Sequence, residues 1–404
     1  MVALHIAMEK GHTRDLSRFT AAISAVTMRS DVVILGAGMA GASLAYELAV
    51  NGGRRVTIVE IEAQPGRHST GRSAAMFFES YGNPTVRALT RASRHFLEHP
   101  PAGVADVPLL TPRSCLFVAD APRLASIDAM FSALDRASSL RRVDVAEALE
   151  RVPILRRDWV AGGLVDETGH DIDVAALHQG YLRMAKRAGA VLLLGAGEPR
   201  IERNAGRWTV DSCAGSVEAP ILVNATGAWA DQLAVQLGAR PVGLQPMRRT
   251  AVLLPAPLDH DIRNWPLVVD IDERFYFKPD AGKLLLSPAN EDPMPPCDVM
   301  PEEIDVALAV DRFERATTVR VDRVGHRWAG LRSFVADRSP VVGFDAGVED
   351  LFWLAGQGGY GIQTAPGLAR LAAGLLTRST WPLAPQVAPA AVAPSRAGLK
   401  SRAN

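Results

Sequence analysis

The sequence predicts a mixed α/β (α+β) fold, in which a parallel-sheet domain assembled from discontinuous segments carries a second, β-rich domain. Strand-like apolar runs alternate with helical patterns near the start, in the middle and near the end of the chain. From about residue 231 to 327, short β-rich runs are instead separated by Pro, Gly and Asp turns. No internal repeat interrupts this order, so an inserted antiparallel domain is the simplest arrangement.

The elements of the parallel part can be followed in order. Strands are expected, in chain order, at residues 32–35, 56–59, 191–194, 220–224 and 351–355. Helices are expected at residues 37–50, from Asp173 as the N-cap through residue 188, and after the last strand up to about residue 376. In the β-rich part, residues 274–278 and 283–287 read as strands.

Composition favours small molecules as partners. The 404 residues are 48% hydrophobic, which is enough for substantial cores, and 44 basic residues balance 44 acidic ones. A net charge of zero provides no field for nucleic acid or an anionic membrane surface. No apolar run approaches the roughly 20 residues that span a bilayer, so no stable membrane span is expected.

The cysteines and the two ends of the chain also constrain the reading. Cys115, Cys213 and Cys297 show no metal or disulfide spacing, so we expect no metal site and a reducing, cytoplasmic location. Residues 1–30 lack both a clear period and a hydrophobic signal core and are expected to form an N-terminal extension. The Ala/Pro-rich tail over residues 384–404 is expected to be disordered.

A glycine motif follows the first strand and opens the first helix. The motif reads Gly36-Ala37-Gly38-Met39-Ala40-Gly41. Gly36 permits a tight turn, Gly38 lets a pyrophosphate approach the backbone, and Gly41 packs the helix on the strand. Glu60 ends the next strand, where it would accept hydrogen bonds from an adenosine ribose. This Rossmann-like combination favours a dinucleotide, and the acid disfavours NADP, which leaves FAD or NAD.

A resemblance to a known family resolves this choice. Arg72-Ser73-Ala74-Ala75 resembles the segment beside the flavin in the glycine and D-amino acid oxidase (DAO) family. Other stretches are similar to bacterial D-arginine dehydrogenases, so that the resemblance covers residues 31 to about 376. These stretches are residues 171–181, 243–246, 275–280, 328–334 and 357–364. The resemblance implies an FAD-dependent oxidoreductase, and since no cysteine follows residue 328, the FAD is expected to be non-covalent.

The same resemblance implies a division into domains. Residues 31–102, 163–228 and 328–380 are expected to form the FAD-binding domain, and residues 103–162 and 229–327 the substrate-binding domain. Motif and resemblance together place these residues at the cofactor: Gly36, Gly38, Met39, Ala40, Gly41, Glu60, Arg72, Ser73, Ala74, Ala75, Gly227, Gly330, Gly358, Gly359, Tyr360, Gly361, Ile362 and Gln363. The loop over residues 356–361 is expected to turn its amides toward the flavin.

The resemblance also implies the substrate contacts. Arg332 is expected to hold a substrate carboxylate, because a guanidinium matches a carboxylate bidentately. Arg249 and Tyr276 occupy positions for further contacts to that carboxylate, and the carbonyl of Gly359 is expected to accept a hydrogen bond from the substrate amine. Tyr81 matches a mobile lid tyrosine, although a turn packed on the surface is an equal alternative.

Three positions depart from the D-arginine dehydrogenase pattern. Met76 stands where those enzymes have a histidine, Phe78 where they have a threonine, and Cys115 where a glutamate receives the guanidinium. Each change removes polarity, and loss of the partner of a buried charge costs about 2–5 kcal/mol. The sequence therefore favours a D-amino acid with a neutral or apolar side chain.

These residues imply oxidative deamination by hydride transfer from Cα to flavin N5, giving a 2-oxo acid and ammonia. The electron acceptor would be a quinone, another carrier or O2. Two alternatives remain open. One is an oxidase of glycine, sarcosine or another secondary amine that produces H2O2, and the other is a non-catalytic flavoprotein.

Overall fold

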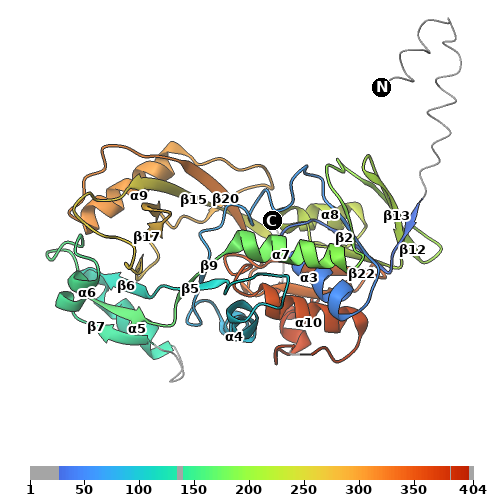
Figure 1. Ribbon diagram of the computed structural model, residues 1–404, viewed down its shortest axis with the longest axis horizontal. Coiled ribbons are helices and arrows are strands. Elements are labelled where there is room, and N and C mark those ends of the chain that lie inside the picture. Colours follow the sequence, from blue (N-terminus) through green and yellow to red (C-terminus); the bar gives the residue numbers. More distant parts are fainter. Residues whose placement is uncertain (1–26, 134–139, 383, 400–404) are drawn as a thin grey trace, which may run out of the picture.

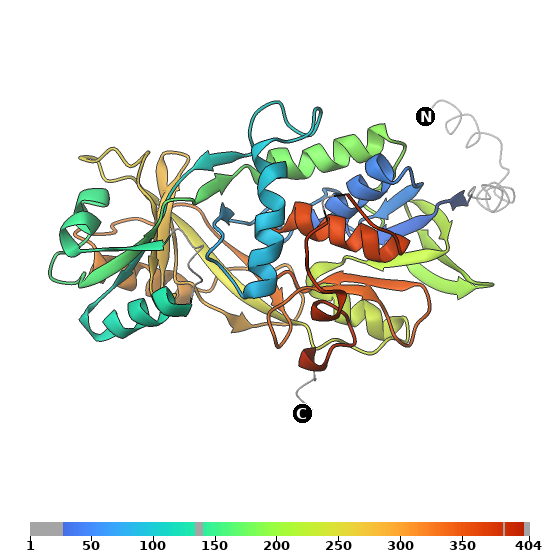
Figure 2. The same ribbon diagram turned by 90° about the horizontal axis from the view of Figure 1, so that it is seen from below.

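The computed structural model describes residues 27–133, 140–382 and 384–399. Figures 1 and 2 show an elongated molecule of two lobes, one built around a parallel sheet with helices and the other dominated by a large antiparallel sheet. The mixed α/β fold class is confirmed.

The first lobe contains a six-stranded sheet. In spatial order its strands are β10 (Val191–Leu193), β3 (Val56–Val59), β2 (Val32–Leu35), β14 (Ile221–Asn224), β22 (Leu351–Ala355) and β21 (Val341–Phe344). All neighbours pair in parallel except β21 and β22. Neighbouring strands come from distant parts of the chain, and all residues of β2, β3 and β22 are buried, as expected for a parallel sheet covered on both faces.

Four helices cover one face of this sheet (Figure 2). They are α3 (Met39–Tyr46), which continues into the π-helical turn η2 (Glu47–Asn51), α4 (Pro84–Glu98), α7 (Val174–Arg187) and α10 (Ala365–Thr377). Helix α3 lies against α7 and α10, and its small residues allow this close packing. The Asp173 side chain caps α7 by accepting a hydrogen bond from the Ala176 amide, as the sequence predicted.

The opposite face is covered by a small sheet and by α8 (Ala230–Gln236). The small sheet contains β1 (Met28–Arg29), β13 (Gly215–Ala219), β12 (Arg207–Ser212) and β11 (Arg200–Asn204) in this order. Strand β1 lies within the segment expected to be an extension, and it pairs in parallel with β13. Residues 27–30 therefore belong to the fold, while residues 1–26 lie outside the described part of the chain.

The second lobe is built on a nine-stranded sheet. Its strands are β19 (Asp292–Pro293), β15 (Gln245–Pro255), β18 (Lys283–Ser287), β17 (Tyr276–Asp280), β16 (Leu267–Asp270), β6 (Cys115–Ala119), β8 (Gly162–Asp166), β7 (Leu140–Val143) and β20 (Arg327–Phe334). Helices α5 (Leu124–Ala133), α6 (Val145–Arg151) and α9 (Glu303–Ala316) pack around it. A three-stranded sheet of β4 (Met76–Phe77), β9 (His170–Ile172) and β5 (Leu110–Pro112) completes the described strands.

Two strands of the nine-stranded sheet come from segments that were expected in the FAD-binding domain. Residues 163–166 and 328–334 were assigned to the FAD-binding segments, but they form most of β8 and β20 in the nine-stranded sheet. Strand β20 pairs with β15 over eight residue pairs, and β8 pairs with β6 and β7. Pairing between strands that are far apart in the sequence leaves no local sequence pattern, so the sequence alone did not indicate these partners.

The expectation of a disordered tail is wrong for residues 384–399. Val392 is completely buried, and the amide of Val342 donates a hydrogen bond to its carbonyl oxygen. Arg396 forms an ion pair with Asp337 at 2.7 Å. The segment packs against the first lobe, and these contacts hold it in place although it has no hydrophobic core of its own. Residues 400–404 lie outside the described part of the chain.

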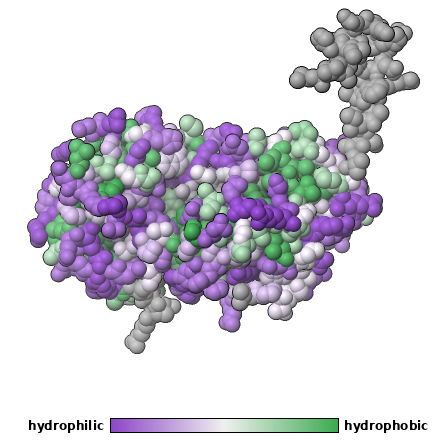
Figure 3. All heavy atoms as spheres, in the orientation of Figure 1, coloured by the Kyte–Doolittle hydropathy of each residue, from purple (hydrophilic) through white to green (hydrophobic). Residues whose placement is uncertain are grey.

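The face of the molecule in Figure 3 is mainly hydrophilic, with hydrophobic residues in scattered groups. Among the helices that the structure describes, none combines the length and the apolar composition required to cross a membrane. The described residues also contain no group of three or more His, Cys, Asp or Glu side chains arranged to hold a metal ion.

Candidate active site

A cavity of ≈ 690 Å³ extends from the glycine motif to strands β15 and β20. Most residues expected at the cofactor line it, namely Gly36, Gly38, Met39, Ala40, Glu60, Arg72, Ser73, Ala74, Gly227, Gly330, Gly358, Gly359, Gly361 and Ile362. Arg249, Tyr276 and Arg332 line its other end. A single cavity thus joins the two sets of residues that the sequence assigned to cofactor and substrate.

The glycines at the first end are required by close backbone contacts. A Cβ atom on Gly41 would overlap the carbonyl oxygen of Gly36, and one on Gly36 would overlap that of Ala225. Gly36 also has a φ of 100°, which favours glycine. Gly41 therefore does not line the cavity but packs α3 against the turn, which is the role that the motif predicts.

The peptide unit of Ala37 is held from both sides. Its N–H donates to Glu60 Oε2 at 2.7 Å, and its carbonyl oxygen lies 2.8 Å from Nε2 of the buried His178. Burial lowers the pKa of His178, so the ring is neutral at pH 7 and its Nε2–H donates this hydrogen bond. The ring also packs on Gly66. His178 carries no sequence signal of its own, and the sequence interpretation missed it.

Replacing His178 with Leu is expected to weaken FAD binding about five- to thirtyfold, because an unsatisfied buried carbonyl costs about 1–2 kcal/mol and loosens the glycine turn. The measurement is the FAD dissociation constant of the apoprotein, taken from quenching of flavin fluorescence. His178→Gln keeps a donor near Ala37 and should restore most of the affinity. Equal FAD affinity in the Leu variant and the wild type would exclude this role.

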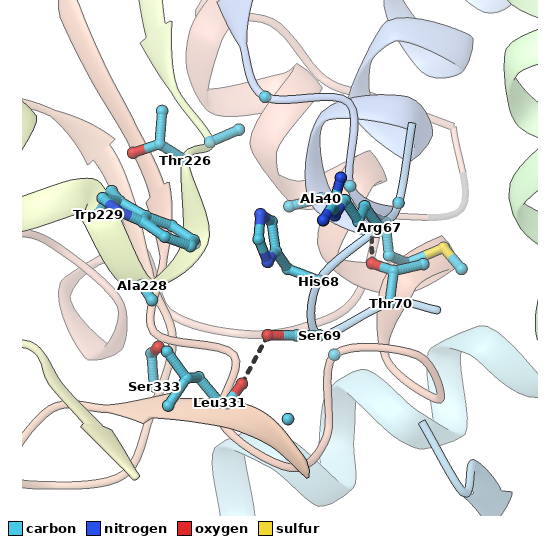
Figure 4. A pocket seen from close by; sticks show the side chains of 18 of the residues that line it. Ala40, Arg67, His68, Ser69, Thr70, Thr226, Ala228, Trp229, Leu331 and Ser333 are labelled. Atoms are coloured by element: carbon cyan, nitrogen blue, oxygen red, sulfur yellow. Dashed lines mark hydrogen bonds between the residues drawn. The ribbon is translucent and has the colours of Figure 1, made fainter. Parts of the chain in front are cut away.

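The segment before Ala74 forms the middle of the cavity wall. Arg72 donates hydrogen bonds to the carbonyl oxygens of Val299 and Ala329 and pairs with Asp298. Figure 4 shows Ser69 bonded to the carbonyl oxygen of Leu331, at 2.6 Å. These contacts fasten the segment to the second lobe. Ala75, at its end, does not line the cavity.

Two aromatic side chains meet within the cavity that were not assigned to the site. His68 and Trp229 project toward each other in Figure 4, and their ring centroids are 4.8 Å apart. His68 is held by Glu62 Oε1 at 2.9 Å from its Nε2. The pair lines the same cavity as Glu60 and the glycine motif.

The loop before α10 turns tightly against β20. Gly358 has a φ of 55°, and a Cβ atom there would overlap the Phe334 ring. A Cβ atom on Gly359 would lie 3.0 Å from Nη1 of Arg332, so the Arg332 guanidinium sits directly against this loop. The positive φ and the close Phe334 ring require glycine at Gly358, and Gly359 leaves room for the Arg332 guanidinium beside the loop.

Two residues of the expected cofactor set face away from the cavity. Tyr360 packs on Tyr81 and Phe334, with ring centroids 4.8 and 6.1 Å away. Gln363 Nε2 donates to Thr90 at 2.9 Å, which ties α10 to α4. Both residues therefore support the loop from behind.

Two guanidinium groups face the substrate end. Arg249 is 7% exposed, and burial together with the charge of Arg332 lowers its pKa. The half-buried Arg332 guanidinium has no hydrogen-bond or ion-pair partner among the described residues. Burial lowers its pKa, but electrostatic interactions with Tyr276, Tyr81, Glu273 and Glu291 outweigh this and raise the pKa. The two guanidinium groups lower the pKa of the buried Tyr276 hydroxyl despite its burial. Two guanidinium groups that line one cavity can bind an anion.

The positions assigned to the side-chain pocket lie together beside this site. Phe78 and Cys115 belong to one apolar cluster, against which Met76, Tyr81 and Tyr276 pack. Phe78 stacks on Tyr81 with ring centroids 4.9 Å apart. Burial raises the pKa of the Cys115 thiol, which is therefore neutral. Met76, Phe78, Cys115 and Tyr81 do not line the cavity itself, so the pocket that they would form is a packed apolar wall behind Tyr276.

The residues along the cavity fit FAD. Glu60 and the glycine turn provide acceptor and amide groups at one end, and a glycine-rich loop before a helix provides a close-fitting wall at the other. The family assignment agrees, since the family described as FAD dependent oxidoreductase (DAO) matches residues 31–375. The chain belongs to this family. FAD is accordingly its cofactor.

Individual relatives are distant. The mitochondrial dimethylglycine dehydrogenase of Rattus norvegicus is 23% identical over 371 residues, a match that covers 85% of this chain and 42% of that protein. The chain thus spans less than half the length of this relative. Among solved structures, glycine oxidase from Geobacillus kaustophilus has a TM-score of 0.74 at 22% identity and covers 87% of this chain and 96% of its own. L-proline dehydrogenase from P. horikoshii has a TM-score of 0.76 at 22% identity, with 89% and 96% covered. These structures share the fold.

Proposed function

We propose that this DAO-family protein oxidises a small amino acid at its α-carbon, and that the substrate is a D-amino acid with a neutral or apolar side chain. The observation that carries the proposal is the Arg332 guanidinium, which faces the cavity without an ion-pair partner among the described residues. A desolvated charge of this kind is costly unless a ligand neutralises it, and a carboxylate matches its geometry.

The residues around the guanidinium have complementary roles. Arg332 binds the substrate carboxylate, and the Tyr276 hydroxyl donates a second hydrogen bond to it. The Gly359 carbonyl oxygen lies on the loop that touches Arg332 and accepts a hydrogen bond from the substrate amine. Three contacts fix the α-carbon in one orientation, which is the main catalytic contribution of the protein. FAD, when bound, supplies the two-electron acceptor.

The reaction balances with water and one acceptor. The amino acid loses its α-hydrogen with two electrons and one proton from nitrogen, and becomes an imino acid. Water hydrolyses the C=N bond to give the 2-oxo acid and ammonia. A quinone, another carrier or O2 then takes the electrons away. Nothing in the cavity selects among these acceptors, so the proposal rests on the amine half of the reaction.

The apolar wall supports the choice of side chain. Met76, Phe78 and Cys115 gather behind Tyr276, where D-arginine dehydrogenases, which the chain resembles, are expected to hold a guanidinium. Cys115 is neutral and fully buried and has no capacity to balance a cation. Preference for the D configuration rests on that resemblance.

A second candidate is oxidation of glycine, sarcosine or another secondary amine. Its support is that Phe78 and Cys115 do not line the cavity, which limits the space for a side chain. The names of glycine oxidase and dimethylglycine dehydrogenase among the relatives point in the same direction. Faster turnover of sarcosine than of any D-amino acid, with release of H2O2, would favour this candidate.

The proposed reaction is tested by its products. The purified holoenzyme, given D-methionine and an artificial electron acceptor, is expected to release one 2-oxo acid and one ammonia for each acceptor molecule reduced by two electrons. Derivatisation of the 2-oxo acid and an enzymatic ammonia assay measure both. Reduction of the acceptor without ammonia would contradict deamination, because cleavage of the C=N bond would then be missing.

A further inference from the structure

The second arginine of the site already has an acidic partner. The Arg249 Nη2 atom lies 3.1 Å from Glu291 Oε1, and its Nε donates to the carbonyl oxygen of Asn290 at 2.7 Å. Arg332 has no such partner among the described residues. The two guanidinium groups at the substrate end are therefore unequal, although both line the same cavity.

Glu291 is itself held from behind. Arg338 donates from Nη1 to Glu291 Oε2 at 3.0 Å and from Nη2 to Glu291 Oε1 at 2.9 Å, and its guanidinium lies over the Phe334 ring. The Glu291 side chain is 27% exposed and that of Arg338 is 41% exposed, whereas that of Arg249 is buried. Water therefore screens the Glu291–Arg338 pair more than the Glu291–Arg249 pair. Burial raises the pKa of Glu291, but the hydrogen bonds from Arg338 and the charges of Arg338, Arg249 and Arg332 outweigh it, and the carboxylate is ionised at neutral pH.

The remaining charges facing the site complete the balance. Glu273, in the turn between β16 and β17, is exposed, and the charges of Glu273 and Glu291 both raise the pKa of Arg332. Burial raises the pKa of Tyr81 and of Tyr360, so both phenols are neutral. Among the described residues at the substrate end, only the half-buried Arg332 carries a positive charge that no directly bonded carboxylate cancels. The site is thus built to take one negative charge.

We infer that Glu291 is a specificity-determining residue that cancels the charge of Arg249 and restricts the site to ligands with one carboxylate. The inference rests on the proposed function, in which Arg332 binds the carboxylate. A ligand with two carboxylates would bring its second carboxylate toward Arg249 and Glu291. Attraction by Arg249 and repulsion by Glu291 nearly offset each other there. Dicarboxylic amino acids are therefore excluded by charge and not by size.

The test measures anion binding and does not require turnover. The oxidised holoenzyme is titrated with acetate and with malonate, and the visible spectrum of FAD reports occupancy beside it. The wild type is expected to bind acetate more tightly than malonate. Glu291→Gln keeps an acceptor for Arg249 but removes the charge, and it should raise the affinity for malonate relative to acetate by about tenfold or more.

A matched control is available one residue away. Asp292 pairs with Arg248 at 3.2 Å, and Arg248 does not line the cavity. Asp292→Asn removes the same charge and should leave the acetate to malonate ratio of the wild type unchanged. In Arg338→Gln, Glu291 pairs with Arg249 only, so the ratio of acetate affinity to malonate affinity should rise above that of the wild type. This variant provides a second readout if Glu291→Gln is unstable.

The outcomes separate this inference from the proposed function. If both anions bind but Glu291→Gln and Asp292→Asn give the same ratio, the role of Glu291 is overturned while the carboxylate site stands. A wild type that prefers malonate would also overturn it. If neither anion binds the wild type, the carboxylate site itself is contradicted, and the inference is lost with it.

Discussion

Arg332→Met is expected to lower kcat/KM for the best D-amino acid by roughly thirtyfold to several thousandfold. The variant removes the unpaired guanidinium, and truncation of one partner of a buried charge pair costs about 2–5 kcal/mol or more. The loss should appear in both KM and kcat, because the carboxylate contact binds the substrate and also orients its α-carbon. Steady-state kinetics with an artificial acceptor measures it.

The control variant lies on the same strand. Arg327 begins β20, is exposed, and pairs with Glu303 of α9, outside the cavity. Arg327→Met should keep the kinetics of the wild type, and both variants should retain FAD with the same ratio of visible to ultraviolet absorbance. If Arg332→Met remains within about threefold of the wild type, Arg332 does not bind the carboxylate.

The second large effect is discrimination between side chains. D-methionine is expected to exceed D-arginine in kcat/KM by roughly thirtyfold to several thousandfold, because Cys115 is neutral and the buried carboxylate opposite it, Asp166, is already held by Ser80 and Thr168. D-citrulline has nearly the shape of D-arginine but no charge, and it serves as the matched substrate. It should react faster than D-arginine if charge decides.

Two results would contradict the neutral pocket. Faster turnover of D-arginine than of D-methionine would show that a carboxylate receives the guanidinium, and the buried Asp166, opposite Cys115, would be the first candidate. Equal rates for D-citrulline and D-arginine, both far below D-methionine, would show that length and not charge limits the pocket.

Local signals predicted the parts of the fold that depend on neighbouring residues. The turn at Gly36, the close packing at Gly41 and the cap at Asp173 each follow from one residue type at one position, and the structure confirms them. The partners of β8 and β20 depend on contacts between residues far apart in the sequence, and their assignment differed. The expectation of a disordered tail was wrong for the same reason, because Val392 is buried by contacts with segments that are distant in the sequence.

The candidate site likewise contains residues that the sequence identified and residues that it did not. Arg249, Tyr276 and Arg332 were assigned through the family resemblance, and the structure brings them to one end of the cavity. His178 and Glu291 were missed, because a histidine in an amphipathic helix and a glutamate after a strand are common and usually structural. Their importance comes only from what they contact, Ala37 and Arg249.

A carboxylate-bearing amine is expected to reduce the flavin in this cavity. The experiment mixes the holoenzyme anaerobically with D- and L-amino acids, glycine, sarcosine and proline and follows the flavin absorbance. Neutral D-amino acids are expected to bleach the flavin rapidly, and D-arginine is expected to bleach it little. Bleaching by L-amino acids or secondary amines alone would contradict the substrate assignment, and an unchanged spectrum with every amine would contradict the expected flavin reduction itself.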